Sequence, residues 1–263
     1  MRQSSDLSYK TFGEGNKHVI FLHGYCEVKE MWDDFIPLFK DFFDSYKFIS
    51  IDLPGFGESQ MPESLNSLSD AAALVAEFVR SLGADKSIWI GHSLGGYVIL
   101  NLLDQYDEML EGICLFHSSI YTDSQEKKEQ RIKTSNFIRE NGKEAFLLNF
   151  IPNLFFEKNK ISCNKEIHKS IKQGMQNSED SMTKYMEMMR ARLDKSNELA
   201  ASKLPVHFIC GKNDSALPLN ISQKQIRHIS NSSSIILDEC GHMGMFEYPI
   251  ESSRSIKSFL TNI

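Results

Sequence analysis

The chain has 263 residues, 41% of them hydrophobic and 24% charged, which excludes disorder as its main character and predicts one domain, with or without an insertion. Its net charge of -6 disfavours nucleic acid or an anionic membrane surface as a partner. Charged residues interrupt every apolar run, so no membrane-spanning helix is predicted. The polar residues 1–6 are followed by no apolar stretch of the kind that a secretory signal has.

The cysteines predict reduced thiols rather than a disulfide framework. There are five, an odd number, and no two have the Cys-x-x-Cys spacing: Cys26, Cys114, Cys163, Cys210 and Cys240. The histidines show no ligand spacing either, so we expect no metal site and no cofactor. Together with the missing signal, this favours a cytoplasmic protein.

Short apolar runs alternate with longer amphipathic segments along most of the chain. An antiparallel edge strand is predicted at residues 8–12, followed by strands at 18–22, 47–51, 87–90, 112–116, 205–210 and 234–237. Helices are predicted at 29–43, 68–82, 94–106 and 218–229, and a last helix begins at Pro249. Continuous apolar strands between helices indicate an α/β fold, with a mostly parallel central sheet that helices cover on both faces.

Residues 121–203 break this alternation, because they contain no convincing strand. They carry 16 Lys and Arg against 12 Asp and Glu, whereas the rest of the chain is acidic. Five of the eleven methionines and many Phe, Leu and Ile residues also fall here. We interpret the segment as an inserted helical cap on a core made of residues 1–120 and 204–263. A helical excursion with no cavity beneath it would have the same sequence pattern.

The strongest chemical motif is the nucleophile elbow Gly91-His92-Ser93-Leu94-Gly95, which lies between a predicted strand and a predicted helix. A turn that sharp strains the backbone of Ser93, and a side chain at position 91 or 95 would collide with the neighbouring elements. The Ser93 hydroxyl would then stand at a helix N-terminus, where negative charge is favoured. This context favours a nucleophilic Ser93 over a simple tight turn.

A serine nucleophile needs a base, and the base needs a carboxylate that orients it. His242 lies after the last predicted strand, which suits a triad whose members follow in the chain order Ser, Asp, His. Asp214 follows the strand 205–210 and so lies at the carboxyl edge of the sheet. Asp238 is the rival acid, but it is only four residues from His242, and we expect it in a turn or in solvent. His117, at the end of another strand, is a candidate for the pocket wall.

An oxyanion hole would complete the site with two backbone N–H groups. One is predicted to come from Leu94, the residue after the nucleophile. The other is predicted to come from Tyr25, because Gly24 gives the loop after the strand 18–22 its freedom. A plain strand-end turn is the alternative interpretation of this loop, and the Tyr25 side chain is a further candidate for the pocket wall.

These motifs, in this order, resemble those of α/β-hydrolase-fold serine hydrolases with a helical cap, of the esterase-like branch. The resemblance covers nearly the whole chain outside the cap and is carried by Phe21-Leu22-His23-Gly24-Tyr25, Met31-Trp32, Ile51-Asp52-Leu53-Pro54-Gly55-Phe56-Gly57-Glu58-Ser59, Gly91-His92-Ser93-Leu94-Gly95-Gly96, Gly211-Lys212-Asn213-Asp214 and Gly241-His242. The chain departs from the family at its short N-terminus, where one of the family's leading strands is missing. This difference affects only the expected number of strands.

The resemblance implies esterase, lactonase, carbon–carbon bond hydrolase or peptidase-like chemistry with no cofactor. Ser93 excludes the branches that use an aspartate nucleophile, and Leu94 argues against the proline iminopeptidases. We expect a carboxylesterase-like enzyme that acts on a small, partly apolar substrate. A carbon–carbon bond hydrolase for a keto acid and a slow-turnover ligand sensor of the same fold are the alternatives. The sequence leaves the oligomeric state open.

Overall fold

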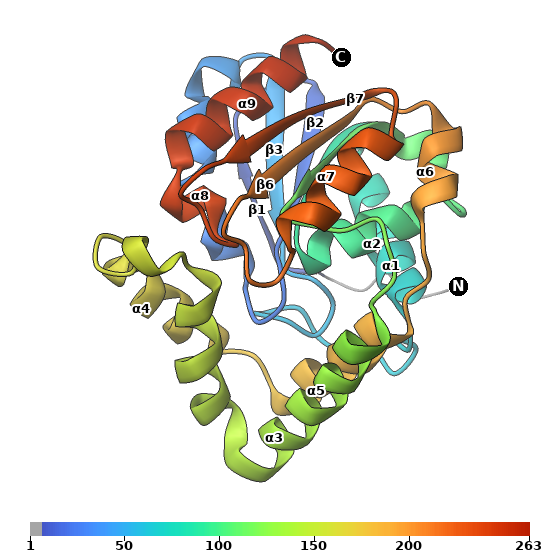
Figure 1. The fold of residues 1–263 in the computed structure, drawn as a ribbon. Coiled ribbons are helices and arrows are strands. Elements are labelled where there is room, and N and C mark those ends of the chain that lie inside the picture. The colour runs from blue at the N-terminus through green and yellow to red at the C-terminus, as the bar shows by residue number, and fades with distance from the viewer. Residues whose placement is uncertain (1–6) are drawn as a thin grey trace.

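The computed structural model describes residues 7–263, whose centre is a seven-stranded sheet (Figure 1). The strands are β1 (Tyr9–Phe12), β2 (Lys17–Leu22), β3 (Tyr46–Ile51), β4 (Ser87–His92), β5 (Leu110–Phe116), β6 (Val206–Gly211) and β7 (Ser232–Leu237). Their order across the sheet is β1-β3-β2-β4-β5-β6-β7. The edge strand β1 pairs antiparallel with β3, and all other neighbouring strands pair in parallel. The predicted fold class is confirmed.

Helices cover both faces of the sheet. In Figure 1, α1 (Leu68–Ser81), α2 (Leu94–Leu102) and α7 (Leu219–His228) lie on one side of the strands, and α9 (Pro249–Thr261) lies on the other. The short helix α8 (Gly244–Glu247) precedes α9, and the 3-10 turn η3 (Asp107–Met109) precedes β5. This cover explains the apolar strands, because all six residues of β4 are buried.

The predicted helix at residues 29–43 is wrong. The segment forms two 3-10 stretches, η1 (Lys29–Trp32) and η2 (Ile36–Phe42), and Phe39 within the second has non-helical angles, with φ -96° and ψ 15°. Pro37 has no N–H to donate, so an α-helical ladder cannot run through this point. The aromatic residues of this segment still pack into the core in a chain of contacts, with Trp32 against Phe35 at 5.8 Å and Phe35 against Phe39 at 5.5 Å between ring centroids.

The helix predicted at residues 94–106 is real but shorter, because α2 ends at Leu102. The side-chain amide of Asn101 donates to the carbonyl of Tyr97 at 2.8 Å, an alternative to regular helix bonding that polar residues commonly provide. The chain then turns, and the N–H of Tyr106 donates to the carbonyl of Leu102 at 2.8 Å.

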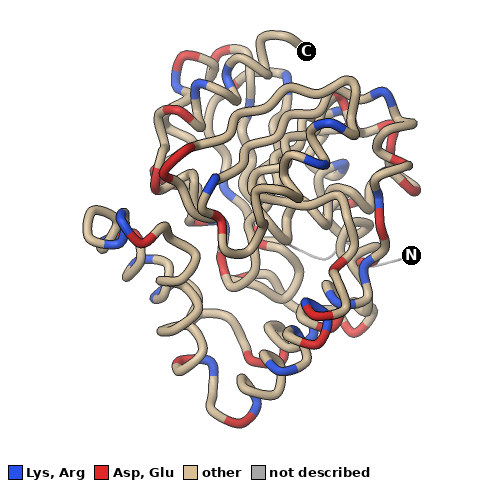
Figure 2. The backbone as a smooth tube through the Cα atoms, in the orientation of Figure 1, with Lys and Arg blue, Asp and Glu red and all other residues tan. Residues whose placement is uncertain are grey.

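Residues 121–203, which connect β5 to β6, contain helices and no strand. The helices are α3 (Gln125–Phe150), η4 (Ile151–Leu154), η5 (Glu157–Asn159), α4 (Asn164–Gly174), α5 (Glu179–Ala191) and α6 (Ser196–Ser202). In Figure 1, α3, α4 and α5 gather beyond one end of the sheet. Figure 2 shows many charged residues along these helices and few on the central strands.

Two tyrosine hydroxyls tie these helices to the core. Tyr25 donates to the carbonyl of Met182 at 3.0 Å, and Tyr185 donates to the carbonyl of Pro54 at 2.9 Å. Both tyrosines are buried. Each bond therefore stabilises the position of α5 above the loops that follow the strands.

Within residues 7–263, no helix combines the length and the apolar character that crossing a membrane requires. Residues 1–6, on which the expectation about a secretory signal depended, lie outside the described part of the chain.

Candidate active site

Ser93 stands between β4 and α2 in a strained conformation, with φ 48° and ψ -108°. A positive φ is rare for a residue that carries a side chain and marks backbone strain. The neighbouring strand β5 holds the turn, because the N–H of Ser93 donates to the carbonyl of Phe116 at 2.9 Å. The carbonyl of Ser93 accepts the hydroxyl of Ser118 at 2.7 Å. The geometry is that of an elbow which presents one side chain at a helix N-terminus.

The two glycines of the motif lie where no side chain fits. A Cβ at Gly91 would lie 2.4 Å from the backbone nitrogen of Gly96, and one at Gly95 would lie 2.5 Å from the carbonyl oxygen of Leu22. Both obstacles are backbone atoms, which cannot rotate away. The close approach of α2 to β2 and β4 therefore requires glycine at these positions.

His242 and Asp214 are brought together at the carboxyl ends of β7 and β6. His242 Nδ1 lies 2.7 Å from Asp214 Oδ2, and both side chains are buried. The other carboxylate oxygen, Oδ1, accepts the N–H groups of Ala216 and Leu217, each at 2.8 Å. Burial by itself would raise the pKa of Asp214, but the facing imidazoles of His242 and His117 hold that pKa well below its usual range. Asp214 is therefore an ionised acceptor, and His242 Nδ1 donates to it.

The rival acid, Asp238, lies away from this group. Its side chain is exposed and pairs with Lys212 at 3.0 Å. This exposed position agrees with the expectation of a turn or solvated residue. Surface pairs of this kind contribute little to stability.

Ser93 and His242 line the same cavity, which has a volume of about 530 Å³. The loops after the strands form one side of it, and α3, η4 and α5 form the other. Its apolar lining includes Tyr25, Phe150, Leu154, Met186, Met189 and Leu217. The cationic side chains of Lys127 and Arg131 also line it. The cavity thus lies between the core and the helices of residues 121–203.

The two predicted oxyanion donors lie on different elements, and Tyr25 lines the same cavity as Ser93. Tyr25 lies on the loop after β2, and Leu94 is the first residue of α2. Among the hydrogen bonds found within residues 7–263, none uses the N–H of either residue. The carboxylate of Glu27 fixes the loop, because its Oε2 accepts the N–H of Gly24 at 2.5 Å.

No sequence motif pointed to Glu27, which forms a buried pair with His92. Glu27 Oε2 lies 2.8 Å from His92 Nδ1, and His92 Nε2 lies 2.9 Å from the carbonyl oxygen of His242. Burial alone would lower the pKa of His92, but Glu27 raises it above its ordinary value. Because both partners are acceptors, His92 satisfies both only as an imidazolium. The pair connects the loop of Gly24 to the loop of His242.

His117 contributes more than the pocket wall on which the sequence analysis placed it. It lines the cavity, and its Nδ1 lies 3.0 Å from Asp214 Oδ2, the same oxygen that His242 contacts. Its backbone has a positive φ of 50°. The nitrogen and oxygen atoms of His117, Asp214 and His242 lie within 4.8 Å of one another, the spacing of a metal site, but here Asp214 engages both histidines by hydrogen bonds.

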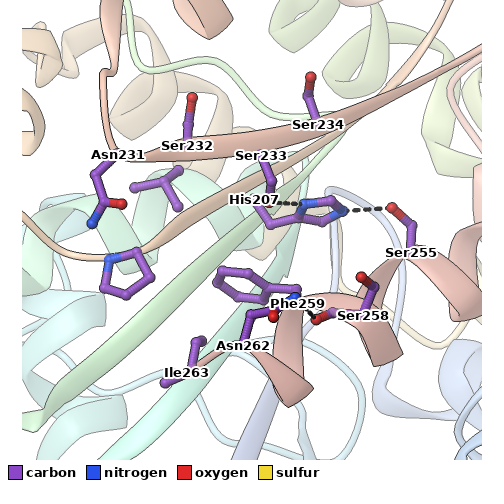
Figure 3. A pocket seen from close by; sticks show the side chains of 12 residues that line it. His207, Asn231, Ser232, Ser233, Ser234, Ser255, Ser258, Phe259, Asn262 and Ile263 are labelled. Atoms are coloured by element: carbon purple, nitrogen blue, oxygen red, sulfur yellow. Dashed lines mark hydrogen bonds between the residues drawn. The ribbon is translucent and has the colours of Figure 1, made fainter.

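A second pocket, of about 350 Å³, lies at the opposite end of the sheet, where β6 and β7 begin (Figure 3). Its most polar feature is His207, whose two nitrogens lie 2.7 Å from the Ser233 hydroxyl and 2.8 Å from the Ser255 hydroxyl. Burial lowers the pKa of His207 to about 4. Both hydrogen-bond partners found for this histidine within residues 7–263 are serine hydroxyls, and neither carries the negative charge that would make it a strong base.

Known proteins are similar to this chain in sequence and in fold. Among curated relatives, the chain is 22% identical to the pimeloyl-[acyl-carrier protein] methyl ester esterase of Wigglesworthia glossinidia brevipalpis, over 96% of each chain. It is also 22% identical to a 2-hydroxy-6-oxononadienedioate/2-hydroxy-6-oxononatrienedioate hydrolase of Burkholderia vietnamiensis, over 97% of this chain and 90% of the relative. Among solved structures, a thermophilic esterase from Thermogutta terrifontis has a TM-score of 0.89 at 24% identity, over 98% of this chain and 97% of the other.

The family model described as alpha/beta hydrolase fold matches residues 17–249, which include all seven predicted site residues, from Tyr25 to His242. The chain therefore belongs to the α/β-hydrolase fold family.

Proposed function

We propose that the protein is a serine hydrolase that cleaves a carboxylic ester or a related acyl bond through an acyl-enzyme. The observation that carries this proposal is the convergence of three elements on one cavity. Ser93 stands on a strained elbow, His242 lines the same cavity, and Asp214 engages His242 Nδ1 at 2.7 Å. The esterase and hydrolase activities in the names of the relatives support the reaction class.

In the proposed mechanism, Ser93 Oγ attacks a carbonyl carbon while His242 takes its proton. Because Asp214 engages Nδ1, Nε2 is the nitrogen that is left to act as the base. The N–H groups of Tyr25 and Leu94 stabilise the oxyanion, and the N-terminus of α2 adds a favourable dipole. His242 then protonates the leaving group and activates the water that releases the acyl group. No step requires a cofactor.

The cavity favours a small and partly apolar substrate. Aromatic, leucine and methionine side chains make up much of its lining, and a volume of about 530 Å³ is within the range of small-molecule sites. The helices of residues 121–203 supply Phe150, Met186 and Met189 to it, so we propose that this segment is a cap that shapes the substrate site.

A carbon–carbon bond hydrolase for a keto acid is the second candidate, because Lys127 and Arg131 also line the cavity. Arg131 is paired with Asp123, so Lys127, whose Nζ donates to the carbonyl of Ala216, is the cation that an anionic substrate group would meet there. Turnover of dienoic keto acids with little ester hydrolysis would favour this function. A ligand sensor of the same fold would show slow turnover together with a large thermal shift on ligand binding.

We also propose that the protein is cytoplasmic. All five cysteines are free and buried, which is typical of proteins that fold in reducing compartments.

The experiment is a comparison of wild type, Ser93→Ala and Ser234→Ala on p-nitrophenyl esters of increasing acyl length. Ser234 is an exposed residue of β7 and serves as the matched control. We expect Ser93→Ala to lose at least about 1,000-fold in kcat/KM with the fold intact, because no other group supplies the nucleophile. Hydrolysis by Ser93→Ala at the wild-type rate would overturn the proposal.

A further inference from the structure

We propose that His117 is a positioning residue that shares the carboxylate of Asp214 with His242 and thereby weakens the interaction of that carboxylate with the base. The inference rests on the proposed function, in which His242 is the base. It adds a second imidazole to the group of Ser93, His242 and Asp214.

The contact is built into the fold. His117 Nδ1 and His242 Nδ1 lie 3.0 Å and 2.7 Å from the one oxygen Asp214 Oδ2, and all three side chains are buried. The backbone N–H of His117 donates to the carbonyl of Ile209 at 2.8 Å, and the imidazole ring stacks on Phe116 at 5.3 Å between ring centroids. These contacts hold the residue in place, although its backbone φ of 50° is uncommon for histidine.

The protonation of His117 follows from its surroundings. Its Nε2 is buried and has no hydrogen-bond partner in the described chain, so a proton there would be unsatisfied. Burial lowers the pKa of His117, and the attraction of Asp214 only partly opposes this. His117 is therefore neutral with its proton on Nδ1, and it donates that proton to Asp214 Oδ2.

Asp214 Oδ2 thus accepts two N–H donors at once. A carboxylate oxygen that already accepts one hydrogen bond attracts a second donor less, so a positive charge on His242 gains less from Asp214 than it would without His117. The other ionisable groups near the His117 ring are His242, at 5.6 Å between centroids, and His92, at 6.2 Å. Glu27 pairs with His92, and Asp214 is the hydrogen-bond partner that His117 and His242 share.

The test uses two substitutions of nearly equal shape. His117→Asn keeps an N–H donor and suits a positive φ, whereas His117→Leu has no donor. The rate at which a fluorophosphonate probe labels Ser93 is measured against pH, since this rate depends on the base and requires no known substrate. We expect the acid limb of the profile to move to higher pH in His117→Leu, by about half a pH unit or more, and His117→Asn to stay close to wild type.

Identical profiles for His117→Leu and His117→Asn would overturn the inference, even if both variants label more slowly than wild type. If His117→Leu does not fold, His117→Gly replaces it, because glycine accepts the positive φ and has no side-chain donor. The two proposals fail differently. A wild-type protein that is not labelled at Ser93 contradicts the proposed function and this inference together, whereas coincident profiles contradict the role of His117 alone.

Discussion

The two ends of the parallel sheet both hold buried histidines but surround them with different partners. At the carboxyl ends of the strands, His92, His117 and His242 contact the carboxylates of Glu27 and Asp214. At the amino ends, His207 contacts only the hydroxyls of Ser233 and Ser255 among its hydrogen-bond partners. Glu27 raises the pKa of the buried His92, whereas burial between two hydroxyls lowers the pKa of His207. The comparison suggests why acid–base chemistry would be confined to one end.

The largest effect should come from removing the carboxylate charge. In Asp214→Asn, the side-chain NH₂ would face the Nδ1–H groups of His117 and His242, two donors that it cannot accept. His242 would then shift its proton from Nδ1 to Nε2, the nitrogen that must act as the base. We expect kcat for p-nitrophenyl butyrate to fall about 1,000-fold or more. The matched change at the other end, Ser255→Ala, should leave kcat within about twofold because it touches no part of the proposed mechanism. Equal losses in the two variants would contradict the comparison.

A smaller effect should follow from breaking the buried pair of Glu27 and His92. Glu27→Gln removes the charge that raises the pKa of His92, so His92 loses its proton and one of its two hydrogen bonds. We expect a loss of about 3 kcal/mol in the free energy of unfolding at pH 7, measured by urea denaturation. In wild type, the raised pKa of His92 gives stability that is complete below about pH 6.5 and is lost as the pH rises through its folded pKa. In Glu27→Gln this loss of stability at alkaline pH should disappear. If it persists, the charged pair of Glu27 and His92 is not its cause.

Two glycine-to-alanine substitutions compare how well the two ends of the sheet accommodate an added Cβ atom. A Cβ at Gly95 would meet the backbone carbonyls of Leu22 and His23 at 2.5 and 2.8 Å. A Cβ at Gly112, near the beginning of β5, would meet the end of the Ile263 side chain at 2.6 Å, which can rotate away. We expect Gly95→Ala to lose about 2 kcal/mol of stability or more and Gly112→Ala to lose clearly less. Thermal unfolding of both variants measures this, and equal losses would show that backbone contact at the elbow is not the cause.

The smallest effect is the contribution of His207 to the pH dependence of the unfolding free energy. Its folded pKa of about 4 lies below the unfolded value, so the unfolded chain binds a proton that the folded chain does not between pH 6.5 and 4. Stability therefore falls as the pH drops through this window. His207→Gln should remove about 2 kcal/mol of the difference in unfolding free energy between pH 7 and pH 5. An unchanged difference would mean that His207 is not buried in its neutral form.

The elbow was predictable from the sequence because its geometry is local. The strand, the turn at Ser93 and the two glycines lie within ten residues, and the backbone itself imposes glycine there. The parallel sheet was predictable from continuous apolar strands. The helix predicted at residues 29–43 was wrong because a stripe of apolar residues at helical spacing does not reveal the break near Pro37.

The contacts of Glu27 and His117 could not be predicted, since they join residues that are 65 and 97 positions apart. Only the order of the strands in the sheet brings these pairs together. For His117, the one signal in the sequence was its place directly after a buried strand, at the same edge as Asp214 and His242. That position suggested the pocket, but not the shared carboxylate oxygen.

The most direct test of the central claim is to react the protein with a fluorophosphonate probe and to locate the adduct by mass spectrometry. Our account predicts one modified residue, Ser93, and loss of the modification when His242 is replaced by Ala. An adduct on another serine, or undiminished labelling of Ser93 in His242→Ala, would contradict it.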